Sequence, residues 1–195
     1  MKGIEDYNVI LASGSPRRQQ FLKDLDIPFQ VKLRTVEEHF PDHLYKAEIP
    51  EYLAKQKAEA YDDLIPNDVL ITGDTIVWQK DKALNKPADR DEAFKMISSL
   101  KDSMHEVISA FCIRIGNEYI VKSDSTEVFF ENLSEDDIWY YIHKYKPFDK
   151  AGAYGIQEWI GQVGISKIKG SYFNVMGFPT HLFYQTLKAL IHEKQ

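Results

Sequence analysis

Two adjacent arginines, Arg17 and Arg18, follow a short apolar run at a point where the sequence predicts the start of a helix. Gly14 permits a sharp turn, Ser15 is a favourable N-cap residue, and Pro16 suits the first helical position. A helix N-terminus attracts anions through its backbone N–H groups and its dipole, and guanidinium groups bind phosphate oxygens in a bidentate fork. The pattern indicates a phosphate site. The alternative interpretation is a capped helix with two solvated arginines.

A second chemical signal is the polar break Gly73-Asp74-Thr75 inside an otherwise apolar strand pattern. Burying a carboxylate among apolar residues is costly without a partner. Asp74 therefore either makes local hydrogen bonds or holds a cation or a water molecule for chemistry. Ligands of α/β proteins gather at the carboxyl ends of strands, which favours the second interpretation.

Further charged residues become candidates if the substrate is anionic. Glu37 and Glu38 follow the second predicted strand, and a carboxylate there would join Asp74 in holding a hard divalent ion. Lys57 lies on an alanine-rich helix face, and Lys86 precedes a proline that keeps its backbone extended. For each lysine, the alternative is a solvated surface group.

These residues have to be positioned by an alternating order of strands and helices. Apolar periodicity and capping signals predict strands at 9–11, 28–34, 68–79, 105–115, 119–131 and 163–169, and helices at 16–22, 49–61, 88–100, 134–145 and 180–193. The pair 105–115 and 119–131 reads as a hairpin around Gly116-Asn117. This order predicts an α/β fold with a mixed sheet flanked by helices.

Composition limits the alternatives. With 195 residues we expect one domain, 1–195, a length that also allows two lobes around a cleft. The net charge of −6 argues against a nucleic-acid binder, and no apolar run approaches the roughly 20 residues that span a bilayer. The one cysteine, Cys112, lies in an apolar run typical of a buried structural thiol. With no signal-peptide pattern at the start, we expect a cytoplasmic protein.

Several familiar sites are missing from the sequence. It contains no P-loop, no dinucleotide-binding glycine motif and no nucleophile elbow of a serine hydrolase. His39 and His43 are four residues apart, but Pro41 between them argues against a helical zinc pair.

Five segments, in order and with matching spacing from residue 9 to residue 179, resemble the Maf family. They are Leu-Ala-Ser-Gly-Ser-Pro-Arg-Arg (11–18), Gly-Asp-Thr-Ile-Val (73–77), Asn-Lys-Pro (85–87), Asp-Lys-Ala-Gly-Ala-Tyr-Gly-Ile-Gln (149–157) and Gly-Ser-Tyr-Phe-Asn-Val-Met-Gly-Phe-Pro (170–179). The resemblance implies a nucleoside triphosphate pyrophosphatase that uses a divalent metal, Mg²⁺ or Mn²⁺. It also implies a twisted mixed sheet in two lobes around a deep cleft, like inosine triphosphate pyrophosphatase, and often a homodimer.

The resemblance also assigns roles by position. It implies Asp74 as the catalytic aspartate, Glu38 with Asp74 as metal ligands, and Lys57 and Lys86 as the lysines facing the phosphates. It also implies that the first motif binds the substrate through Ser13, Arg17 and Arg18.

Base selection in the family is associated with three positions, which are here Arg17, Thr75 and Gln157. This combination is similar to the branch that hydrolyses dTTP and UTP. One departure is Glu158-Trp159, where the branch usually continues with glycine, so the loop shape and the breadth of base selection stay open. The alternatives are a preference for another base, such as 7-methyl-GTP, or a non-catalytic nucleotide-binding regulator of cell division. The paired carboxylates Glu38 and Asp74 favour the enzyme.

Overall fold

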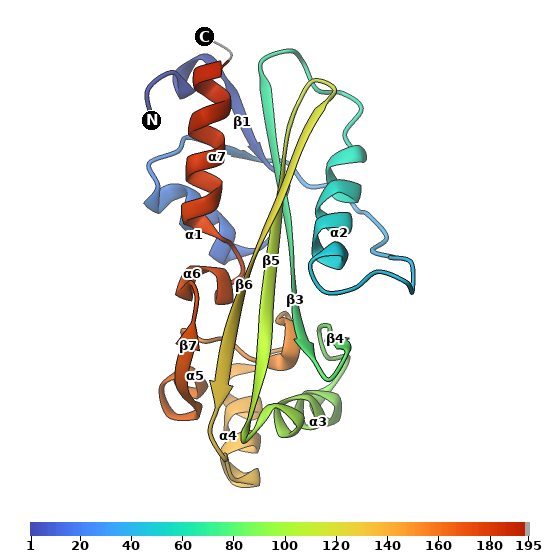
Figure 1. Cartoon of the computed structure of the whole chain (residues 1–195), viewed down its shortest axis with the longest axis vertical. Coiled ribbons are helices and arrows are strands. Elements are labelled where there is room, and N and C mark those ends of the chain that lie inside the picture. Colours follow the sequence, from blue (N-terminus) through green and yellow to red (C-terminus); the bar gives the residue numbers. More distant parts are fainter. Residues whose placement is uncertain (194–195) are drawn as a thin grey trace. The chain divides into compact units, whose positions relative to one another are not determined.

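The computed structural model describes residues 1–193 and contains short helices, longer helices and one sheet (Figure 1). The strands are β1 (Asn8–Leu11), β2 (Gln30–Val31), β3 (Asp68–Gln79), β4 (Lys82–Leu84), β5 (Ser103–Ile115), β6 (Glu118–Phe130) and β7 (Ile165–Lys169). The α-helices are α1 (Pro16–Asp24), α2 (Glu48–Glu59), α3 (Arg90–Leu100), α4 (Glu135–Tyr145), α5 (Trp159–Gly164), α6 (Tyr172–Val175) and α7 (Thr180–Glu193), with 3-10 turns η1 (Ile4–Asp6) and η2 (Ala151–Ala153).

The seven strands form one sheet in the order β2-β1-β3-β5-β6-β7, with β4 paired to β3. β1 pairs in parallel with both β2 and β3, whereas β4 is antiparallel to β3 and β7 is antiparallel to β6. The predicted α/β fold with a mixed sheet and flanking helices is therefore confirmed.

The chain divides into two compact units that interleave in sequence. The first contains Met1–Asp74, Ser109–Asp124 and the chain from Gly177 onward, and the second contains Thr75–Ile108 and Ser125–Met176. The predictions of a single domain, 1–195, and of a deep cleft between two lobes stay predictions.

In the first unit, helices cover both faces of β1, β3 and β5 (Figure 1). Ala110 and Cys112 of β5 pack toward α2, and Phe111 between them packs against the ring of Phe183 in α7. This alternation is the two-residue period of a strand buried on both faces. Cys112 is fully buried, and burial raises the pKa of its thiol to about 12. The predicted structural role of this cysteine is thereby supported, because the thiol stays protonated at neutral pH.

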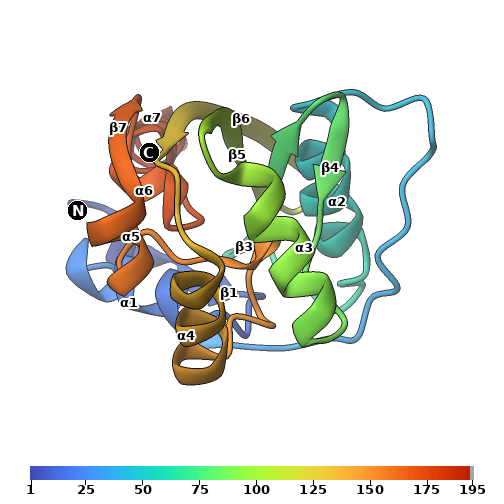
Figure 2. The same cartoon turned by 90° about the horizontal axis from the view of Figure 1, so that it is seen from below.

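In the second unit, α3 and α4 lie side by side and pack against the strands (Figure 2). Ile97, Ile138 and Ile142 belong to the hydrophobic core of this unit and are fully buried. Ser134 caps α4 in a capping box with Asp137, at the start of the helix predicted over 134–145. None of the helices in residues 1–193 is both long enough and apolar enough to cross a bilayer.

A histidine is buried in this second core. His105 of β5 is 1% exposed, and its Nε2 lies 2.7 Å from the Tyr154 hydroxyl. Within the described residues its Nδ1 has no hydrogen-bond partner. The ring packs against Phe130 and Tyr154, with centroid separations of 5.4 Å. Burial lowers the pKa of His105 to about 3, so the imidazole is neutral in the folded protein.

We expect His105 to make the protein less stable in mild acid. The unfolded chain takes up a proton near pH 6.5, whereas the folded chain does so only near pH 3. The free energy of unfolding attributable to His105 therefore falls by about 2 kcal/mol between pH 7 and pH 5. Urea unfolding of wild type and His105→Phe at both pH values measures it, since other titrating groups cancel in the difference. Equal pH dependence in the two proteins would contradict the prediction.

Most predicted elements are present, with three differences. β2 is only two residues long and exposed, rather than a strand over 28–34. β4, α5 and α6 were not predicted, because segments of three to six residues carry too little periodicity to detect. The predicted strand at 163–169 begins instead at Ile165, after α5 ends.

Candidate active site

The turn between β1 and α1 has the predicted strand–turn–helix form. α1 begins at Pro16, and Ser15 occupies the N-cap position with extended backbone. In the described chain the Ser15 side chain makes no capping hydrogen bond to the helix. Instead the Ser15 N–H donates to Ser13 Oγ at 3.3 Å. The Ser15 hydroxyl therefore does not occupy the first-turn N–H groups of α1, and these groups together with the helix dipole favour an anion beside Arg17.

Arg18 was predicted to bind the substrate, but in the structure its guanidinium contacts backbone carbonyls. Its Nη1 donates to the Gly73 carbonyl at 2.8 Å, and its Nε donates to the Gly177 carbonyl at 3.0 Å. Nη1 also lies 3.5 Å from Ser13 Oγ. Burial lowers the pKa of Arg18, against the opposing influence of the nearby Asp74. Arg18 thus joins α1 to the backbone immediately before Asp74, and substrate binding by Arg18 stays a prediction.

Gly73 is required where β3 approaches β5. A Cβ at this position would lie 2.8 Å from the Ala110 carbonyl oxygen, closer than real Cβ atoms approach backbone. The same Cβ would lie 3.5 Å from the Arg18 guanidinium carbon. The glycine therefore lets the strand come close to its neighbour while leaving its carbonyl to Arg18.

Two carboxylates, Glu38 and Asp74, meet at one lysine, Lys57. Lys57 Nζ donates to Asp74 Oδ1 at 2.6 Å and lies 2.9 Å from Glu38 Oε1. Asp74 is buried in β3, and Lys57 occupies the last turn of α2. The Thr72 hydroxyl donates to the Ala54 carbonyl at 2.6 Å, which fixes α2 against β3 two residues before Asp74. The strand β3 and the segment that carries Glu38 thus both contact the ammonium of Lys57 on α2.

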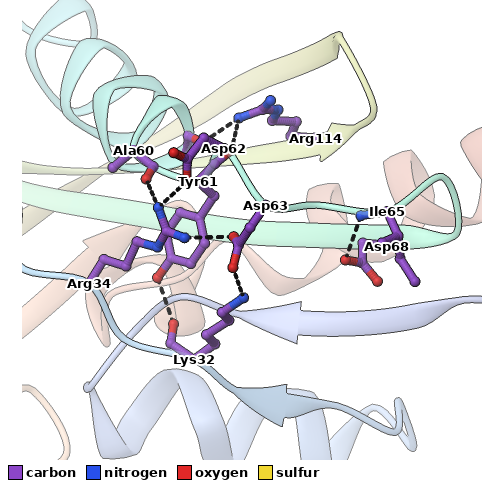
Figure 3. Close-up of polar contacts among 10 residues, drawn as sticks. Lys32, Arg34, Ala60, Tyr61, Asp62, Asp63, Ile65, Asp68 and Arg114 are labelled. Atoms are coloured by element: carbon purple, nitrogen blue, oxygen red, sulfur yellow. Dashed lines mark hydrogen bonds and ion pairs between the residues drawn. The ribbon is translucent and has the colours of Figure 1, made fainter.

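The segment leading to Glu38 is held by a cluster of ion pairs at the end of α2 (Figure 3). Arg34 lies 2.7 Å from Asp62 and 2.6 Å from Asp63, and it donates to the Ala60 carbonyl. Lys32 pairs with Asp63 at 2.6 Å. Surface ion pairs contribute little stability individually, but these act together on one stretch of chain four residues before Glu38.

Backbone contacts complete this arrangement (Figure 3). The Tyr61 hydroxyl donates to the Lys32 carbonyl at 2.6 Å. Arg114 of β5 donates to the carbonyls of Ala58 and Tyr61 at 2.9 and 2.7 Å. These two carbonyls lie at the C-terminal end of α2, where a cation complements the helix dipole. Sequence reasoning missed Arg34 and Arg114, because their partners depend on tertiary contacts with no local pattern.

The other predicted site residues lie in the second unit. Thr75 directly follows Asp74 in β3, and Lys86 is exposed after β4. The Asn85 carbonyl beside Lys86 accepts from the Gly152 N–H at 3.2 Å, so this segment is joined to the loop that ends at Gln157. The structure thus brings Glu38, Lys57 and Asp74 into direct contact, and it links the Lys86 segment to the Gln157 loop.

These features define a mixed α/β protein with arginine at a helix N-terminus and two carboxylates around a lysine, a set suited to phosphate chemistry. The model of the family described as Maf-like protein matches residues 8–190. The chain belongs to the Maf family, and the resemblance seen in its motifs is confirmed.

Similar proteins cover nearly the full length. A protein from Christiangramia forsetii named dTTP/UTP pyrophosphatase is 52% identical over 190 residues, covering 97% of each chain. One of the same name from Flavobacterium johnsoniae is 49% identical over 189 residues, covering 96% of this chain and 97% of its own. Among solved structures, the Staphylococcus aureus Ham1 protein is similar with a TM-score of 0.48 and 12% identity, covering 63% of this chain and 71% of that one.

Proposed function

We propose that this protein hydrolyses dTTP and UTP to the nucleoside monophosphate and pyrophosphate. Relatives at 52% and 49% identity bear the name dTTP/UTP pyrophosphatase. The observation that carries the proposal for this chain is the contact of Asp74 and Glu38 with Lys57, since a binding protein for phosphates has no need of paired acids among its cations. Modified pyrimidine nucleotides belong to the same substrate class.

The residues divide the chemistry among them. Asp74 orients the attacking water and accepts its proton, while the bond from the α-phosphorus to the bridging oxygen breaks and pyrophosphate leaves. Arg17, Lys57 and Lys86 neutralise charge on the phosphates, which lowers the barrier to phosphoryl transfer. Ser13 and Arg18 shape the turn that receives the phosphates, with Arg18 anchored on backbone carbonyls.

The donor set suits a hard divalent cation. Asp74 and Glu38 present carboxylate oxygens at 2.6 and 2.9 Å from the same ammonium, so the structure already places a positive charge between them. Within residues 1–193, no group of three or more His, Cys, Asp or Glu side chains is arranged for a metal. Mg²⁺ is typically held by one or two carboxylates together with substrate phosphates, which matches this pair. When bound, Mg²⁺ or Mn²⁺ would polarise the phosphate and help to neutralise the leaving group.

We assign base selection to Arg17, Thr75 and Gln157, following the family pattern. Gln157 is half-buried and carries both a donor and an acceptor, as needed to read the edge of a pyrimidine. The cytoplasmic location and the homodimer stay predictions.

The test is pyrophosphate release from a panel of dTTP, UTP, CTP and 7-methyl-GTP, with Mg²⁺, with Mn²⁺ and with EDTA. We expect metal-dependent turnover that favours dTTP and UTP and is abolished by EDTA. Turnover that favours a nucleotide with another base would support the hydrolytic reaction but contradict the assignment of dTTP and UTP as substrates. Nucleotide binding without turnover would mean that the protein is a nucleotide-binding regulator and not an enzyme.

A further inference from the structure

The acid that departs from the family pattern, Glu158, is held by two other side chains. Its Oε1 lies 3.1 Å from Lys150 Nζ, and its Oε2 accepts a hydrogen bond from the Tyr141 hydroxyl. Its backbone N–H donates to the Gly155 carbonyl at 3.0 Å. Glu158 also occupies the N-cap position of α5. One residue therefore connects α4, the loop before Gln157 and the start of α5.

These contacts are shielded from solvent. The Lys150 side chain is 9% exposed and that of Glu158 is 19% exposed. Lys150 Nζ has a second carboxylate partner, Asp149 Oδ1, at 2.7 Å. An ammonium so buried needs its counter-charge, because removing one partner of a buried pair leaves an uncompensated charge. Both carboxylate partners of Lys150, Asp149 and Glu158, thus lie in or next to the loop that carries Gln157.

Tyr141 extends the network to the loop backbone. Its hydroxyl accepts from the Gly155 N–H at 3.0 Å while it donates to Glu158. Burial, together with the Glu158 carboxylate, raises the pKa of Tyr141, so the hydroxyl remains a donor at neutral pH. The two ends of the turn 155–158 are therefore joined through one hydroxyl and one carboxylate.

The side chains of Glu158, Lys150 and Gln157 all pack close to Gly155. A Cβ there would lie 3.0 Å from Glu158 Cδ, 3.0 Å from Lys150 Cε and 3.1 Å from Gln157 Nε2. The amide of Gln157 thus packs over the same α-carbon as the Glu158–Lys150 ion pair. Displacing the ion pair would free space beside the amide and allow it to change its position.

We propose that Glu158 is a positioning residue for base selection, which fixes the Gln157 amide through Lys150, Tyr141 and Gly155. The proposal rests on the proposed function, in which Gln157 reads the pyrimidine. Glu158 acts on the discrimination between nucleotides and not on the hydrolytic step, since its side chain contacts Lys150 and Tyr141 and its backbone bonds to Gly155 and Gly161, all in the Gln157 loop, α4 and α5.

The experiment measures kcat, KM and Kd for dTTP, UTP and CTP in Glu158→Ala, Glu158→Gln and Gln157→Ala. In Glu158→Ala we expect the preference for dTTP over CTP to fall by about tenfold to 100-fold, mainly through KM, as misplacing a positioning group does. Glu158→Gln keeps an acceptor for Tyr141 and the size of the side chain, so it should recover most of the preference. Asp149→Asn is the matched control, because it removes the other carboxylate beside Lys150 and should keep the preference.

Two further measurements make the outcome decisive. In the double variant Gln157→Ala with Glu158→Ala, the preference should fall no further than in Gln157→Ala, since Glu158 acts through Gln157. Equal loss for all three nucleotides, or a wild-type preference in Glu158→Ala, would overturn the proposal. If Glu158→Ala fails to fold, Tyr141→Phe, which removes one contact to Glu158, tests the same prediction. A wild-type protein without turnover rejects the proposed function instead, and the ratio of Kd values then tests Glu158 independently.

Discussion

Asp74→Asn is expected to lower the turnover of dTTP by about 10²–10⁴-fold, the range typical of a lost general base. The amide has the shape of the carboxylate and still offers an oxygen to Lys57, which lies 2.6 Å from Asp74 Oδ1. It cannot accept a proton and is a poor ligand for a divalent ion. The melting temperature should therefore change little while kcat falls.

The comparison variant for this prediction is Glu38→Gln, at the other carboxylate on Lys57. Glu38 is more exposed than Asp74, so its loss should weaken metal dependence with a smaller effect on kcat. Pyrophosphate release at saturating Mg²⁺, together with thermal unfolding, measures both effects. Undiminished turnover in Asp74→Asn would show that Asp74 is a structural partner of Lys57 and not the catalytic aspartate.

Asp74 illustrates what sequence reasoning can reach. An acid inside an apolar strand is a local contradiction, and such contradictions mark functional positions. In the structure Lys57 forms ion pairs with both Glu38 and Asp74, while the roles of the three residues in catalysis stay predictions. Their mutual geometry could not be predicted, because it depends on how α2 packs on β3 and on how Arg34 holds the segment before Glu38.

The fold, too, could be predicted from the sequence only in part. The long elements have clear periodicity, and β3 and α7 have the predicted bounds 68–79 and 180–193. The second strand was overestimated, since Pro28–Arg34 alternates correctly but pairs with β1 only at Gln30 and Val31. Beyond Val31, the Lys32 N–H still donates to the Leu11 carbonyl of β1, and ion pairs of Lys32 and Arg34 with side chains after α2 hold the segment. Such contacts leave no local signal in the sequence.

Arg18→Ala is expected to destabilise the protein by about 2–5 kcal/mol, because it leaves two buried carbonyls without their donor. Those carbonyls belong to Gly73 and Gly177, at 2.8 and 3.0 Å from the guanidinium. For a chain of this size, that loss corresponds to a fall in melting temperature of roughly 5–15 °C. Arg18→Lys should be intermediate, since a single ammonium is a poor substitute for a planar fork that serves two acceptors.

The prediction separates two roles for the arginine pair. Lys23→Ala removes one positive charge from an exposed position of the same helix, and its stability should match the wild type within about 0.5 kcal/mol. Thermal unfolding and KM for dTTP are measured for both variants. An unchanged melting temperature with a strongly raised KM in Arg18→Ala would mean that Arg18 binds the phosphates directly. A lower melting temperature with a KM close to that of the wild type would instead mean that Arg18 holds the backbone at Gly73, one residue before the carboxylate of Asp74.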